Sequence, residues 1–89
     1  MFINRNESLL LEHYFLSARR IAALEQLLSN ETPREKAFAI ENNIDRNLRK
    51  LVAIELRTRS AALRRACSYL IDHHRFDRNW RAYLCIDVC

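Results

Sequence analysis

The chain contains no glycine and only one proline among its 89 residues. Tight β-hairpins depend on glycine or similar residues that accept positive φ angles, so a chain without glycine is poorly suited to many turns. No apolar run comes near the length of about 20 residues that a membrane-spanning helix needs. These absences argue against a β-rich or membrane-spanning protein. They predict an all-α fold made of a few long helices with few connections.

The cysteines are odd in number, and the apolar run near the amino terminus is short. Cys67, Cys85 and Cys89 cannot all pair within one chain, and an odd count is typical of free thiols in a reducing compartment. The apolar run Leu9–Leu11 is much shorter than the hydrophobic region of a secretory signal peptide. We therefore expect an intracellular, cytoplasmic protein.

The composition is that of a folded domain with a basic second half. Hydrophobic residues make up 49% of the chain and charged residues 29%, which suits a single domain with a modest core. The formal net charge is +4, but residues 1–44 carry five basic and six acidic residues, whereas residues 45–89 carry ten and five. All but two of the fifteen basic residues are arginine, which binds phosphate and carboxylate groups bidentately and also forms surface ion pairs.

The first expected element is a helix over about residues 6–29. Its apolar residues recur at intervals of three, four and seven, which places them on one side of a helix: Leu10, Tyr14, Ile21, Leu24 and Leu28. The stretch SNETPREK then predicts the end of this helix and the start of another. Thr32 is a good N-cap, Pro33 suits the first helical position, and Glu35 would complete a capping box. Because the connection is short, the two helices should form an antiparallel hairpin.

The second expected element is an unusually long helix over about residues 33–72. Apolar residues continue at intervals of three and four, without interruption by glycine or proline. Such a helix would be roughly 60 Å long, against roughly 36 Å for the first. A short third helix over about residues 77–86 should fold back and close the core. The alternative is that the second helix continues into the tail, because Tyr69, His73, Phe76, Trp80 and Tyr83 keep helical spacing.

The unequal helix lengths predict self-association. The first helix would leave the far half of the second uncovered, including Leu56, Leu63 and Leu70. The C-terminal segment could cover part of this apolar surface, and a second copy of the chain could cover the rest. We therefore expect residues 1–89 to form a single helical domain that assembles into a homodimeric bundle resembling a coiled coil.

The residues that carry metal or catalytic chemistry show no specific motif. Cys67, His73, His74, Cys85 and Cys89 are of the types that bind zinc, but no paired Cys-x-x-Cys spacing is present. The simpler interpretation makes Cys67 a buried apolar residue, and makes the histidines hydrogen-bonding groups at a helix end. There is also no glycine-rich phosphate loop or HExxH sequence. We expect no enzyme, cofactor, metal or small-molecule substrate, although metal binding by these residues stays open.

The basic second half offers a nucleic-acid hypothesis. Seven arginines lie between residues 57 and 81 and alternate with aromatic residues, which could bind phosphates and stack on bases. On one continuous helix Arg57, Arg64 and Arg78 would lie near one another. The simpler interpretation is a solvated basic surface over an aromatic core, which Glu55, Asp72 and Asp77 could partly neutralise as surface pairs.

The surplus of apolar and aromatic residues favours protein binding instead. The leading hypothesis is a small non-enzymatic regulatory or adaptor protein that binds a protein partner through a helical face. The alternative is an Arg-rich helical RNA- or DNA-binding regulator, and no membrane association is expected. Nine residues are the candidate contacts in either case: Phe15, Phe38, Arg57, Arg64, Arg65, Arg75, Arg78, Trp80 and Arg81.

Overall fold

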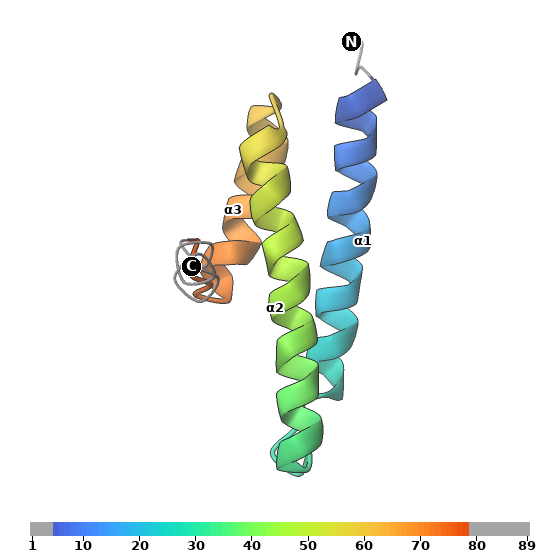
Figure 1. The fold of residues 1–89 in the computed structure, drawn as a ribbon, viewed down its shortest axis with the longest axis vertical. Helices are drawn as coiled ribbons and strands as arrows, with labels where there is room; N and C mark the ends of the chain where they lie inside the picture. Colours follow the sequence, from blue (N-terminus) through green and yellow to red (C-terminus); the bar gives the residue numbers. More distant parts are fainter. Residues whose placement is uncertain (1–4, 79–89) are drawn as a thin grey trace, which may run out of the picture.

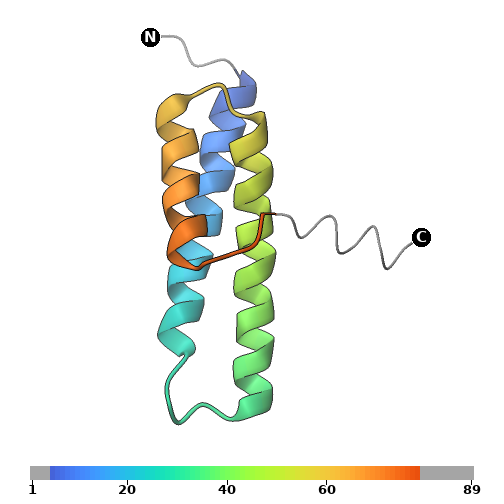
Figure 2. The ribbon, with the colours of Figure 1, turned by 90° about the vertical axis from the view of Figure 1, so that its left-hand side faces the viewer.

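The computed structural model describes residues 5–78, and three α-helices account for most of them (Figure 1). The helices are α1 (Arg5–Leu27), α2 (Arg34–Arg57) and α3 (Ala61–His73). α1 and α2 run in opposite directions as a hairpin, and α3 turns back along α2 (Figure 2). The predicted all-α hairpin is confirmed. None of the helices within residues 5–78 is both long and apolar enough to cross a membrane.

The core lies along α2, which both other helices contact. α2 contributes most of the buried apolar side chains, α3 contributes three and α1 contributes one. The cluster consists of Ile21, Ile40, Ile44, Leu48, Leu51, Val52, Ile54, Leu63, Cys67 and Ile71. Partly buried residues of α1, among them Leu10, Tyr14 and Leu24, pack against this cluster. The helical spacing of these apolar positions is therefore what orients all three helices.

The turn between α1 and α2 does not contain the predicted capping box. α2 begins at Arg34, and Pro33 occupies the N-cap position without a side-chain hydrogen bond. Thr32 instead serves the preceding helix, because its Oγ1 accepts a hydrogen bond from the backbone N–H of Ser29 (2.9 Å) and donates one to the carbonyl of Leu27 (3.3 Å). Proline disfavours helical geometry in the residue before it, and the last carbonyls of α1 lack helical donors. For both reasons the Thr32 side chain caps the end of α1 rather than the start of α2.

The prediction of one helix over residues 33–72 is wrong. The helix ends at Arg57, and a new helix begins at Ala61 after a three-residue connection. The alternative of a helix that continues into the tail is wrong as well. α3 ends at His73, and Arg75 adopts a left-handed backbone conformation with φ of 52°.

The break between α2 and α3 is stabilised by side chains that accept hydrogen bonds from backbone N–H groups. The Glu7 carboxylate of α1 accepts hydrogen bonds from the hydroxyl of Thr58 (2.6 Å) and the backbone N–H of Arg59 (2.7 Å). The N–H of Ser60 donates to the Thr58 hydroxyl at 3.1 Å, and the Ser60 hydroxyl accepts from the N–H of Leu63 at 3.2 Å. In a continuous helix these N–H groups would bond to carbonyls four residues back. The break therefore needs neither glycine nor proline.

The break removes the length mismatch on which the predicted dimer depended. α1 has 23 residues and α2 has 24, and α3 covers α2 with its own Leu63, Cys67 and Ile71. α3 thus covers much of the apolar surface of α2 that a second copy of the chain was expected to cover. Dimerisation stays a prediction. The predicted helix over residues 77–86 lies outside the described residues, except for its first two positions, which are not helical.

Candidate functional site

The antiparallel hairpin places a groove between the start of α1 and the end of α2. Its volume is about 610 Å³. Four apolar residues lie among its lining, together with six polar or charged ones: Leu9, Leu10, Ala53 and Ile54, and Asn6, Glu7, His13, Lys50, Arg57 and Arg59. No residue of α3 lines it, because α3 packs elsewhere on α2. We call the four apolar residues the floor of the groove and Lys50, Arg57 and Arg59 its basic rim.

The single carboxylate in the groove is already engaged. Glu7 has a pKa below its usual value, first because the Thr58 hydroxyl donates to it, and then because the Arg59 N–H does. The positive charges of Arg59 and Arg64 lower the pKa further. Hydrogen bonds to the ionised form favour that form, so Glu7 remains an anion that fixes the connection. The other charged groups of the rim are cationic, and Lys50 and Arg57 are solvent-exposed.

A stripe of exposed leucines continues from the groove along α1. Leu9, Leu16 and Leu27 are between 46% and 59% exposed. Residues seven apart return to nearly the same side of a helix, so Leu9, Leu16 and Ala23 form a line, and Leu27 lies one turn further on. We call these four residues the α1 stripe. It lies beside the buried face of α1, which carries Ile21.

The candidate arginines fall into two groups rather than one face. Arg57 lines the groove, and Arg64 Nη2 donates to the carbonyl of Arg59 at 3.4 Å, so these residues gather at the connection between α2 and α3. Arg65 is exposed in the first turns of α3. Arg75 and Arg78 follow the opposite end of α3, a helix about 20 Å long, and Arg75 is exposed. The expected group of Arg57, Arg64 and Arg78 is therefore wrong for Arg78, which lies beyond the other end of α3.

Arg78 connects the segment after α3 to the helices. Its guanidinium donates to both carboxylate oxygens of Glu55 (3.0 and 3.2 Å), to Asp72 (2.7 Å) and to the Ser68 hydroxyl (2.8 Å). Its pKa is raised, first by Glu55 and then by Asp72. Two of the three acids that were expected to pair with arginines, Glu55 and Asp72, therefore do so, and both pair with Arg78. Most of its donors are already engaged, so Arg78 acts as a structural tie.

The aromatic candidates occupy separate places. Phe15, in the middle of α1, is 55% exposed, and its ring contacts that of Tyr14 edge-to-face with centroids 5.4 Å apart. Phe38, in the second turn of α2, is 64% exposed. Trp80 and Arg81 lie outside the described residues. The structure thus leaves both phenylalanines accessible but does not join them in one contact surface.

Cys67 is the buried apolar residue that its position in the stripe predicted. Its side chain is fully buried, and burial raises the pKa of the thiol to about 11, with a further contribution from the charge of Glu55. The thiolate is the form that binds metals and attacks electrophiles. At neutral pH Cys67 is therefore a protonated thiol in the core and takes no part in a surface site. The other two cysteines lie outside the described residues.

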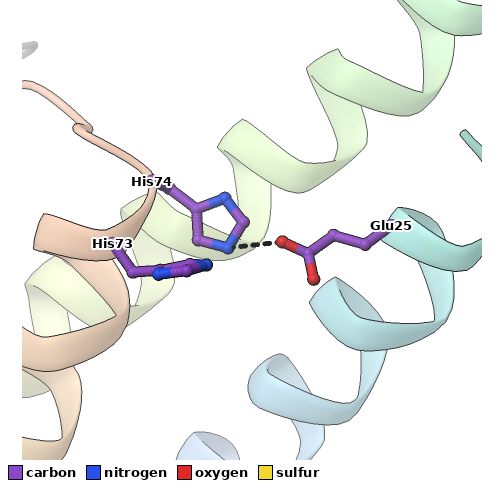
Figure 3. A group of neighbouring side chains, drawn as sticks. All are labelled: Glu25, His73 and His74. Carbon is purple, nitrogen blue, oxygen red and sulfur yellow. Dashed lines mark ion pairs between the residues drawn. The ribbon is translucent and has the colours of Figure 1, made fainter.

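A second group of functional side chains gathers at the far end of α1. His73 and His74 lie close to Glu25, which no pattern in the sequence singles out. His74 Nε2 lies 2.9 Å from Glu25 Oε1, and the two imidazole rings lie nearly perpendicular with centroids 5.2 Å apart (Figure 3). The hydrogen-bonding role that was expected of the histidines at this helix end stays a prediction, while the structure places His74 at ion-pair distance from Glu25. Only the folded chain brings these two side chains together.

Comparisons of this chain with protein-family models, curated proteins and solved structures find no significant match. The groove, the α1 stripe and the histidine cluster are therefore the observations from which function is inferred.

Proposed function

We propose that this protein is a small non-enzymatic adaptor or regulator that binds an acidic amphipathic helix of a protein partner. The observation that carries the proposal is the groove between α1 and α2, with its apolar floor and basic rim. Two antiparallel helices present a channel parallel to their axes, which is the shape that accepts a third helix through residues spaced i, i+3, i+4 and i+7. A docked helix would give a four-helix arrangement, since α3 takes no part in the groove.

The charges of the rim select the partner's chemistry. Lys50, Arg57 and Arg59 border the apolar floor, and the one acid, Glu7, is held by Thr58 and the backbone. The chain as a whole carries a formal charge of +4. Complementary charge at a rim steers association and rejects partners of like sign. A helix with leucines on one side and acidic residues beside them therefore fits the groove, and its basic counterpart does not.

The first test measures how the full chain binds two designed helical peptides by calorimetry. They share one leucine face and carry either glutamate or lysine at the flanking positions. We expect the acidic peptide to bind and the basic one to bind at least tenfold more weakly. Leu9→Asp should abolish binding, because it places a charge on the apolar floor. Equal binding of both peptides, or no binding of either, would contradict the proposal.

Charge-reversal variants locate the binding surface. Lys50→Glu should lower the affinity for the acidic peptide by about tenfold or more and raise the affinity for the basic one, because Lys50 lies on the rim. Arg34→Glu is the matched control, since Arg34 is exposed at the opposite end of α2. It changes the net charge equally and should leave the difference between the peptides intact. If both variants had the same effect, net charge rather than the groove would govern binding.

Nucleic-acid binding is a second candidate, supported by the gathering of Arg57, Arg59 and Arg64 at one end of the molecule. Binding that depends on phosphates weakens steeply with salt as counterions are released. It should be lost when Arg64 and Arg65 are both replaced by glutamate, and it should survive Leu9→Asp. Protein docking in the groove should instead be lost with Leu9→Asp and should weaken less steeply with salt, because the apolar contacts are not screened.

Self-association remains part of the proposal and now involves the α1 stripe. If two copies of α1 packed antiparallel about Leu16, Leu9 would meet Ala23 of the second copy. Glu12 would then lie level with the second copy's Arg20. A two-fold interface pairs a surface with itself, and this stripe is self-complementary in that sense. Because Leu9 belongs to both the groove and the stripe, a dimer and a partner helix would compete for the same surface.

A further inference from the structure

The end of α3 carries two adjacent histidines whose side chains converge on α1. Adjacent residues of a helix normally point in different directions, about 100° apart. His73 is the last residue of α3, but His74 is the C-cap, with φ of −89° and ψ of 1°. Its ring therefore turns toward α1, and Figure 3 shows it directed at the Glu25 carboxylate, with the His73 ring edge-on below it and extending in the same direction. The ring of Tyr69 stacks on His73, with centroids 6.2 Å apart.

We propose that Glu25, His73 and His74 form a binding site for a divalent transition-metal ion of the zinc type. Two imidazole nitrogens and one carboxylate oxygen are a donor set that zinc accepts from proteins. One ligand atom from each residue lies within 4.8 Å of the others, and His74 Nε2 is 2.9 Å from Glu25 Oε1. Ligands of a tetrahedral ion with bonds of about 2.1 Å lie about 3.4 Å apart, so the observed separations need only small side-chain rotations.

The surroundings favour a cation. Glu25 and His74 also line a hollow of about 290 Å³ whose other polar residues are Glu41 and Asp45 of α2. Their carboxylates add negative charge to the hollow that Glu25 and His74 line, and water can occupy the fourth position of a tetrahedral ion. Glu25 and His73 are exposed, so an ion can reach the site without unfolding of the chain.

A metal ion at this site would connect α3 to α1, two helices that are otherwise in little contact. α3 packs mainly against α2 and makes few contacts with α1. An ion bound by His73, His74 and Glu25 would join the end of α3 to the end of α1. Metal binding that occurs only in the folded state stabilises that state by mass action. The ion would therefore raise the melting temperature of the protein and hold α3 in place.

The experiment is a zinc titration of the full chain against a chromophoric chelator. All measurements use a Cys85→Ser/Cys89→Ser background, because these two thiols can bind zinc by themselves. We expect one ion per chain and a rise in melting temperature on adding zinc. Glu25→Gln and His74→Gln should each lower the affinity at least roughly tenfold and remove most of that rise. Circular dichroism checks that both variants keep the helical fold.

The matched control is Glu12→Gln, which removes an exposed carboxylate from the same helix about 20 Å away. It should bind zinc as the parent does. The proposal is overturned if the background chain binds no zinc, or if Glu25→Gln and His74→Gln bind it with the parent's affinity. Cobalt spectra give an independent readout, because ligation by nitrogen and oxygen alone lacks the strong thiolate charge-transfer band. That band in the background chain would place the ion on Cys67 and contradict the site.

Discussion

At the scale of single residues, Glu7 links the start of α1 to the connection between α2 and α3. It lies in the first turn of α1, yet its carboxylate decides where α2 ends, because it accepts from Thr58 and from the N–H of Arg59. A carboxylate that accepts such bonds stabilises the fold only while it is ionised. Glu7 also lines the groove, so the residue that sets the connection shapes the proposed binding surface as well.

Replacing Glu7 with glutamine should lower the melting temperature at neutral pH. The pKa of Glu7 is lowered in the folded chain, so its contribution is fully present above the pKa of the unfolded chain. The contribution is lost as the pH falls through the folded-state pKa, because the protonated acid accepts these bonds poorly. The gap between wild type and Glu7→Gln should therefore narrow in acid, as thermal unfolding at a series of pH values would show. Glu12→Gln should show no comparable gap, and a constant gap for Glu7→Gln would refute the ionic role.

Roles that depend on the local sequence pattern could be predicted from the sequence. Roles that depend on contacts between distant parts of the chain could not. The burial of Cys67 followed from its place in the apolar stripe. Thr32 was assigned to the wrong helix, because a hydroxyl between two helix ends can serve either one. Nothing in the sequence links Glu7 to Thr58, or Glu25 to His74, since these pairs are about 50 residues apart and meet only after the hairpin forms.

At the scale of elements, the connection between α2 and α3 decides how the three helices are arranged. The apolar spacing through Leu56, Leu63 and Leu70 fits a continuous helix, which is why the pattern alone predicted one. Thr58 and Ser60 are the only local signal of a break, since short hydroxyl side chains compete for backbone N–H groups. The predicted arginine face failed for the same reason, because its geometry assumed the continuous helix.

The N-cap of α3 provides a test of this connection. The Ser60 hydroxyl accepts from the N–H of Leu63, which would otherwise lack a partner at the helix start. Ser60→Ala should reduce the free energy of unfolding by about 1 kcal/mol, measured by chemical denaturation. Ser60→Asn should restore most of the loss, because asparagine caps helices about as well as serine. If alanine were as stable as serine here, the cap would not be what starts α3.

At the scale of the whole molecule, α1 holds both ends of α3. Glu7 fixes the connection that precedes α3, and Glu25 meets the histidines at its end. These two glutamates are 18 residues apart, about 27 Å along the helix. The groove lies at the start of α1 and the histidine cluster near the end of α1, so the two sites are separated along the hairpin. A ligand at either end would act on the same third helix, because each end of α3 depends on a side chain of α1.

Light scattering coupled to size exclusion tests the remaining prediction, that the chain forms a dimer through the α1 stripe. Leu16 would lie on the two-fold axis, so Leu16→Glu places two like charges in contact and should yield a monomer. Leu56→Glu is the matched control, because Leu56 is also an exposed leucine but lies on α2 outside the stripe, and this variant should remain dimeric. The wild-type dimer should persist at high salt, since apolar contacts hold it. A monomeric wild type would end the self-association proposal and leave the groove free for a partner helix. Ultraviolet absorbance typical of bound nucleic acid, lost at high salt, would instead favour the arginine-rich end as the binding surface.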